Sequence, residues 1–290
     1  MGRPLTPVDF FLKAHFEPVP AVVLLLLAAW YGWSVARLRR RGRTWPVARS
    51  ASFALAWLLV AVSTFSGLSA FARTNFSAFA SQYIMVGLLA PTLLAFAAPI
   101  SLAVQSSSRP ARLGWMERLP ARVAAHPFAT WIIFAATVFV LFFTKSLLGA
   151  VLRGGAVEQV VFLWLLAAGW LYCWPVADID PAPVRMGHWP RILYLLLEFP
   201  VFAIMGMGLE SQGPRVAAAM TPGSLHVGGA VIWVVGEGIS LLGAIAVFVQ
   251  WLRTDERRAK GQDTVNEAAA ARQLALWRAS REAAARAASR

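Results

Sequence analysis

Seven apolar runs, each long enough to cross a lipid bilayer, recur along this chain of 290 residues. About 20 apolar residues in a helix span the hydrocarbon core, where every backbone polar group must be paired internally. The runs therefore predict an all-α, polytopic membrane bundle of seven transmembrane helices. Their approximate limits are Val19–Val35, Ser50–Phe71, Ala78–Val104, Phe128–Thr144, Val157–Ala177, Ile192–Leu209 and Gly228–Trp251.

The overall composition agrees with a membrane protein. Apolar residues make up 58% of the chain, charged residues 14%, and the mean hydropathy is +0.60. Soluble domains have about 45–50% apolar and about 25% charged residues. We therefore expect one bundle over 19–252, with an N-terminal lead at 1–18 and a basic, Ala/Arg-rich tail at 253–290. The single cysteine, Cys173, excludes an intrachain disulfide and any metal motif built on paired cysteines.

The positive charges predict how the bundle is oriented. Of the 27 Lys and Arg residues, 21 fall in segments on one side of the predicted bundle and six on the other. Because cytoplasmic loops carry the excess of Lys and Arg, we place the N-terminus outside and the C-terminus in the cytoplasm. A basic cluster at 37–49 follows the first run, which indicates a retained anchor rather than a cleaved signal peptide. The net charge of +13 then reflects orientation and anionic lipid, not nucleic acid.

The tail has a helical pattern of its own. A capping-box pattern at 264–267 precedes an Ala/Arg-rich stretch and predicts a cytoplasmic helix over Asn266–Ala288. Leu274, Leu276 and Trp277 give this helix a modest apolar patch. Both a solvated or lipid-contacting tail and a helix that docks a partner fit this pattern.

Two glutamates fall inside predicted spans, where ionisable groups are costly and mark function. Glu237 lies about ten residues into the seventh run, roughly 15 Å deep at 1.5 Å per residue, and we expect it to be buried in the bundle. Trp233 lies one turn away, and Gly236 begins a small-residue stripe that permits close helix packing. The carboxyl either fixes bundle packing or forms a proton or metal site. Glu198 lies just before Pro200, and a proline frees a carbonyl one turn earlier that nearby side chains often satisfy, so we favour a structural role for Glu198 over a functional one.

The third run is an unusual membrane span. It opens with polar residues that include Gln82 and Tyr83, and then continues as an apolar stretch interrupted by Pro91. Taken alone, this pattern is compatible with a channel lining or a metal site.

Other carboxylates lie at the ends of predicted spans. Asp178 and Asp180 follow the fifth run and predict a turn and helix cap rather than a divalent-ion site, because no further oxygen ligands follow at suitable spacing. Glu158 and Glu210 lie at outer span ends near Lys145, where we expect surface pairing of little energetic weight.

The sequence offers little for catalysis. The four histidines, His15, His126, His188 and His226, all lie in tails or predicted loops. An intramembrane bis-histidine haem therefore has no ligands, and the seventh run holds no lysine for a retinal-type Schiff base. Neither a nucleophile–base pair nor a phosphate-binding glycine loop is present. We expect a protein that is not an enzyme.

Short motifs spread from Tyr31 to Trp251 form an ordered set. They are RLRRRGRTWP at 37–46, SGL at 66–68 before Ala72-Arg73, Phe76-Ser77 through Ala90-Pro91 to Ala98-Pro99, WPV at 174–176 with Asp180-Pro181, and GG at 228–229 before Trp233-x-x-Gly236-Glu237. In order, spacing and seven-helix frame they resemble the bacterial cytochrome c oxidase assembly factors called CtaG, which are associated with caa-type oxidases.

The resemblance implies a factor that assists the assembly or maturation of a haem–copper oxidase in the bacterial plasma membrane. Its partners would be membrane lipids and oxidase subunits or other assembly factors. It also implies intramembrane histidines at positions occupied here by Phe79, Tyr83, Glu158, Phe162 and Phe202. Phenylalanine cannot ligate a metal, and neutral tyrosine, with a pKa of about 10, is a poor ligand. The resemblance therefore carries over the fold and the oxidase setting, but not the copper ligands.

Two alternative functions remain. A proton- or solute-conducting protein would use the buried Glu237 and Glu198. A copper-binding protein with an altered ligand set would use Met205, Met207 and Cys173, which are soft enough for Cu(I) but do not restore the lost geometry.

Overall fold

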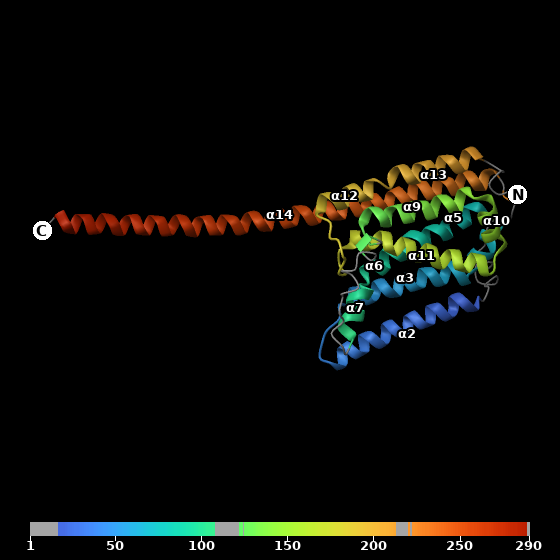
Figure 1. Ribbon diagram of the computed structural model, residues 1–290, viewed down its shortest axis with the longest axis horizontal. Coiled ribbons are helices and arrows are strands. Elements are labelled where there is room, and N and C mark those ends of the chain that lie inside the picture. Colours follow the sequence, from blue (N-terminus) through green and yellow to red (C-terminus); the bar gives the residue numbers. More distant parts are fainter. Residues whose placement is uncertain (1–16, 108–121, 124, 213–219, 221, 289–290) are drawn as a thin grey trace. The chain divides into compact units, whose positions relative to one another are not determined.

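The computed structural model describes residues 17–107, 122–123, 125–212, 220 and 222–288, and every regular element in these ranges is a helix (Figure 1). In chain order the elements are α2 (Pro18–Arg40), α3 (Val47–Phe65), α4 (Gly67–Ala72), α5 (Phe76–Ile84), the π-helix η1 (Met85–Leu89), α6 (Ala90–Phe96), α7 (Pro99–Ser106), α9 (Pro127–Phe143), α10 (Lys145–Arg153), α11 (Ala156–Ala177), α12 (His188–Leu196), α13 (Phe199–Gln212) and α14 (Pro222–Ala288). Some of the predictions concern residues that the structure does not describe. These are the lead at 1–16, the basic loop at 108–121, the Glu210 side chain, Arg215 and the last two residues.

The predicted membrane class is confirmed. Six helical segments of the described chain are long and apolar enough to cross a membrane. Helices α9 and α10 form a seventh span if they are counted together, although they meet at 79° around Thr144. The side of the membrane that each end faces stays a prediction.

The third span, α5–η1–α6, is the most enclosed of these segments, with 61% of its apolar window buried. Pro91 has no N–H to donate to the carbonyl of Gly87, and the chain widens just before it into the π-helix, where the Ala90 N–H bonds to the Met85 carbonyl. A side chain at Gly169 of α11 would overlap the Gly87 carbonyl. The two backbones therefore touch, and this span is a centre of the packing.

The predicted continuation of the third span to Val104 is wrong. The chain turns at Ala98, which has a φ of +53°, and α7 begins at Pro99 as a separate helix. A residue before proline is disfavoured in the α region, so the run of apolar residues does not continue as one helix. The Tyr31 hydroxyl of α2 donates to the Ala97 carbonyl at 3.3 Å and holds this turn.

The core is largely aromatic and lies between α5, α9, α11 and α13. Its largest fully buried rings are Phe76, Phe79, Tyr83, Phe134, Phe142, Tyr172 and Phe202. By contrast, α2 and the part of α14 up to residue 243 expose large apolar side chains such as Leu26 and Val234. This arrangement suits a bundle whose outer surface is covered by lipid.

By packing, the chain divides into two units, residues 1–243 and 244–290. The described residues of the second unit are all helical and belong to α14. The helix predicted over Asn266–Ala288 is present, but its predicted start is wrong. Residues 264–267 lie inside α14, which begins at Pro222.

Candidate functional site

Aromatic side chains from three helices meet where the resemblance implies histidines. Phe79 and Tyr83 extend from α5, Phe162 from α11 and Phe142 from α9, and all four rings are buried. Ring centroids are 6.4 Å apart for Phe79 and Phe162, 5.9 Å for Phe79 and Phe142, and 5.0 Å for Tyr83 and Phe142. The fifth position, Phe202 of α13, belongs to the same core. Phe79, Tyr83 and Phe162 therefore converge with Phe142 and form an aromatic cluster.

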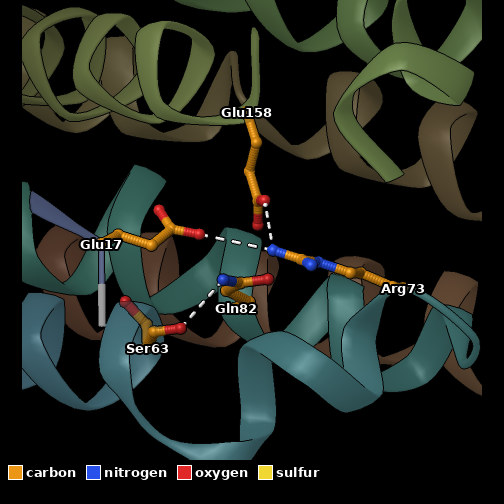
Figure 2. Close-up of polar contacts among 5 residues, drawn as sticks. All are labelled: Glu17, Ser63, Arg73, Gln82 and Glu158. Carbon is orange, nitrogen blue, oxygen red and sulfur yellow. Dashed lines mark hydrogen bonds and ion pairs between the residues drawn. The ribbon is translucent and has the colours of Figure 1, made fainter. Parts of the chain in front are cut away.

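A buried ionic cluster lies one helical turn from Phe162 (Figure 2). Arg73, which follows α4, places Nη2 3.2 Å from Glu158 Oε2 of α11 and 3.3 Å from Glu17 Oε1, just before α2. The two carboxylate side chains are only 6% and 7% exposed, whereas the arginine side chain is 31% exposed. We call Glu17, Arg73 and Glu158 the carboxylate–arginine cluster. It replaces the predicted surface pairing of Glu158 with Lys145, which is wrong in both partner and burial.

Local structure explains why this cluster forms. Glu158 lies in the first turn of α11, where the helix dipole favours a negative charge. The chain reaches that helix through Gly154 and Gly155, whose φ values are +82° and +88°. A Cβ at Gly154 would lie 2.6 Å from Arg73 Cζ, so a larger residue there would displace the guanidinium.

Gln82 is a second buried polar group beside the cluster (Figure 2). Its Nε2 donates to the Ser63 carbonyl at 2.9 Å, while its amide oxygen has no hydrogen-bond partner among the described residues. Glu17 and Phe162 also line a small cavity of about 30 Å³, which is enough for roughly one water molecule. Polar and aromatic side chains therefore meet around this cavity.

The residues present do not fit a copper ion. No group of three His, Cys, Asp or Glu side chains is placed to hold a metal within the described chain. The soft side chains do not converge either: Met205 is fully buried, whereas Met207, two residues along the same helix, is 52% exposed. Cys173 lies 3.4 Å from the Thr92 hydroxyl in the core.

Glu198 is fully buried in the break between α12 and α13. Neither of its carboxyl oxygens has a hydrogen-bond partner in the described part of the chain, and the same holds for the Trp131 indole and the Tyr83 and Tyr172 hydroxyls. Within the described residues, Glu198 therefore does not pair with the carbonyl that Pro200 frees, and its structural role stays a prediction.

Glu237 differs most from its predicted place. It is only partly buried, and its carboxylate accepts a hydrogen bond of 2.5 Å from the indole of Trp233, which is 37% exposed. Gly236, the next residue back, faces inward, and a Cβ there would lie 2.7 Å from the Phe202 ring. Glu237 therefore lies on the outer side of α14, and the prediction that it is buried in the bundle is wrong.

Asp180 caps a helix. Its two carboxylate oxygens accept hydrogen bonds from the backbone N–H groups of Ile100 and Ser101, at 2.9 and 2.7 Å, in the first turn of α7. Arg41 donates to the Ser107 carbonyl at 3.0 Å at the other end of that helix. The geometry is that of the predicted cap rather than of a divalent-ion site.

Sequence reasoning missed Arg73 and Glu17 as members of a site. The two residues are 56 positions apart, and nothing in their spacing relates them. One signal was available: Arg73 is the only basic residue between Arg49 and Arg109. A lone arginine among apolar runs indicates a specific acidic partner, because a charge at membrane depth needs one.

Taken together, the fold and this site define a multi-pass helical membrane protein with a packed aromatic centre and a buried ionic rim. The chain belongs to the Caa3_CtaG family of cytochrome c oxidase caa3 assembly factors, whose sequence profile matches residues 29–254. The matched region spans the helical bundle from α2 to the middle of α14.

Over most of its length the chain is similar to parts of longer mycobacterial proteins. The chain is 24% identical over 284 residues to uncharacterised protein ML1998 of Mycobacterium leprae, and 27% identical over 286 residues to uncharacterised protein Mb0105 of Mycobacterium bovis. Each match covers 91% of this chain and 43% of the relative, so the chain spans less than half the length of these relatives. No solved structure matches the chain.

Proposed function

We propose that this protein assists the assembly of a haem–copper cytochrome c oxidase in the bacterial plasma membrane, as a non-enzymatic factor that binds oxidase subunits or other assembly factors. The observation that carries this proposal is the family match across residues 29–254, over most of the helical bundle. The proposal includes an orientation in which the N-terminus lies outside and the C-terminus lies in the cytoplasm. The distribution of Lys and Arg supports this orientation.

The same proposal makes the protein a binding scaffold rather than a carrier of copper. Its support is the filling of the centre by Phe79, Tyr83 and Phe162. The Phe79 ring stacks on Phe162, and both Phe79 and Tyr83 pack against Phe142. Tightly packed rings stabilise a fixed shape, and a fixed outer shape is what a scaffold needs to hold a partner. The conducting alternative finds no support, since Glu237 lies on the outer side of α14.

Deletion of the gene tests the proposal. Membranes of the deletion strain are expected to lose the absorbance of the assembled oxidase haems and the oxidase activity, and a plasmid copy of the full chain should restore both. Immunoblots of individual oxidase subunits would show which subunit disappears first. Unchanged haem spectra together with normal subunit levels would refute the proposed function.

A further inference from the structure

Two polar side chains on α14 lie where lipid is expected. Trp233 is 37% exposed and Glu237 is partly buried, and they border an exposed apolar stripe that contains Val227, Val234 and Leu241. The opposite face of α14, which includes Gly236 and Ser240, is buried against the bundle. The carboxylate and the indole are therefore on the outside of the bundle.

Glu237 is also near the middle of the candidate span Pro222–Arg257. Glu237 is 15 residues from Pro222 and 20 from Arg257, the ends of the candidate span, and a rise of 1.5 Å per residue puts it roughly 20–30 Å from each. Tryptophan is enriched at membrane interfaces rather than at this depth, and a carboxyl here is costly unless it is paired. A lipid-covered surface does not explain either residue.

The pairing of Glu237 is incomplete. Its carboxylate accepts one hydrogen bond, from Trp233 on its own helix. The ion pairs formed by the described residues involve Arg73 and Arg191, and none of them reaches Glu237. A carboxylate has about four acceptor positions, so most of those on Glu237 remain available to a donor from another chain.

Next to this carboxylate the helix surface has a notch. Gly238 also lies toward the outside, and a Cβ built there would meet nothing within 4 Å. Small residues at such positions let a second transmembrane helix approach closely, which strengthens hydrogen bonds between helices. The notch, the acceptor and the apolar stripe lie together on one helix.

We propose that this face of α14 docks a transmembrane helix of a client oxidase subunit, and that the client helix donates a Lys, Arg or other strong hydrogen-bond donor to Glu237. The inference rests on the proposed function and names its interaction surface. Charge complementarity favours this occupant, because a basic side chain would neutralise the Glu237 carboxylate. A second copy packed symmetrically on this face would place two Glu237 carboxyls together as like charges, and lipid tails would leave the carboxyl unpaired.

Photo-crosslinking in native membranes tests the surface directly. A photoreactive amino acid is placed at Val234, which is 66% exposed, and in a second strain at Leu26 of α2, which is 65% exposed. We expect an adduct with a transmembrane oxidase subunit, identified by mass spectrometry, from Val234 and not from Leu26. Adducts with only a second copy or only lipid, or equal adducts from both positions, would overturn the inference.

Substitutions then separate the surface from the proposed function. In the deletion strain, Glu237→Leu and Gly238→Leu should each lower the assembled oxidase roughly three- to tenfold, the range expected for a hydrogen bond between membrane helices. Gly32→Leu on α2 is the matched control, because a Cβ added at Gly32 would also meet nothing within 4 Å, and it should restore the oxidase fully. Membrane levels of each variant are compared by immunoblot.

The outcomes are distinct. An oxidase that is lost on deletion but fully restored by both Glu237→Leu and Gly238→Leu would overturn the docking surface and leave the proposed function intact. An oxidase that survives the deletion would overturn the proposed function, and with it the surface. Normal oxidase levels with Gly32→Leu, together with reduced levels with the two α14 variants, would support both the docking surface and the proposed function.

Discussion

Arg73 shows how one residue can tie distant parts of a membrane bundle together. Its guanidinium reaches Glu17 before α2 and Glu158 at the start of α11, both nearly fully buried. Arginine suits this role because its planar group can bind two carboxylates at once and keeps its charge when buried. The cluster thereby connects three segments at one end of the bundle.

Removal of the arginine is expected to destabilise the protein. Arg73→Ala leaves two buried carboxylates without a counter-charge, and we expect a loss of about 2–3 kcal/mol in the free energy of unfolding, below the roughly 3–5 kcal/mol of a fully buried pair because the arginine is 31% exposed. Thermal unfolding of detergent-solubilised protein measures the effect. The control is Lys145→Ala, at an exposed position, which should unfold like the wild type. Equal stability of Arg73→Ala and the control would contradict this account.

At the scale of helices, the packing depends on close contact between the third span and α11. The π-helix before Pro91 displaces the backbone locally, and the Gly87 carbonyl comes to lie against Gly169. Small residues such as Gly87 and Gly169 allow the backbones of two membrane helices to touch. Dispersion contacts between the two backbones then stabilise the helix pair.

Gly169→Ala tests this contact. The added methyl group would overlap a backbone carbonyl that has no flexible side chain to move aside, so we expect a loss of about 1–3 kcal/mol from overpacking. Gly32→Ala, at a position with no neighbour within 4 Å, should leave the stability unchanged or slightly raised. The two variants are compared by thermal unfolding under the same conditions. A Gly169→Ala protein as stable as Gly32→Ala would show that the helices can separate without cost.

For the whole molecule, orientation in the membrane is the main property to be measured. The bias of Lys and Arg predicts that the end carrying α10 and the start of α11 faces outward, and that the turn before α12 faces the cytoplasm. Because Cys173 is the only cysteine, a cysteine-free background needs one substitution, Cys173→Ser.

Single cysteines introduced into that background report the orientation. Ser146→Cys in α10 should react with a membrane-impermeant thiol reagent on intact cells, and Gly187→Cys before α12 only after permeabilisation. Both positions are exposed. The background protein without cysteine is the labelling control. Labelling of Gly187→Cys in intact cells, with protection of Ser146→Cys, would reverse the predicted orientation.

Sequence alone determined the class of this protein: an all-helical membrane bundle with six or seven candidate spans, a basic tail and the motifs of an oxidase assembly family. These properties follow from hydrophobic length, charge and short patterns, which are local or additive along the chain. The predictions that were wrong also have physical reasons. Ala98 and Pro99 ended a span that hydropathy alone continued to Val104, because backbone geometry overrode apolarity.

Only the tertiary structure decided which side chains meet. Hydropathy assigns a depth along a helix but not a direction around it, so Glu237 was expected inside and lies on the outer side of α14. Arg73 and Glu158 are 85 residues apart, and their contact depends on how α4 and α11 pack. Helix packing also brings Phe79 and Tyr83 of α5 together with Phe162 of α11 in an aromatic centre. Two helices that pack against each other place residues in contact that lie far apart in the sequence.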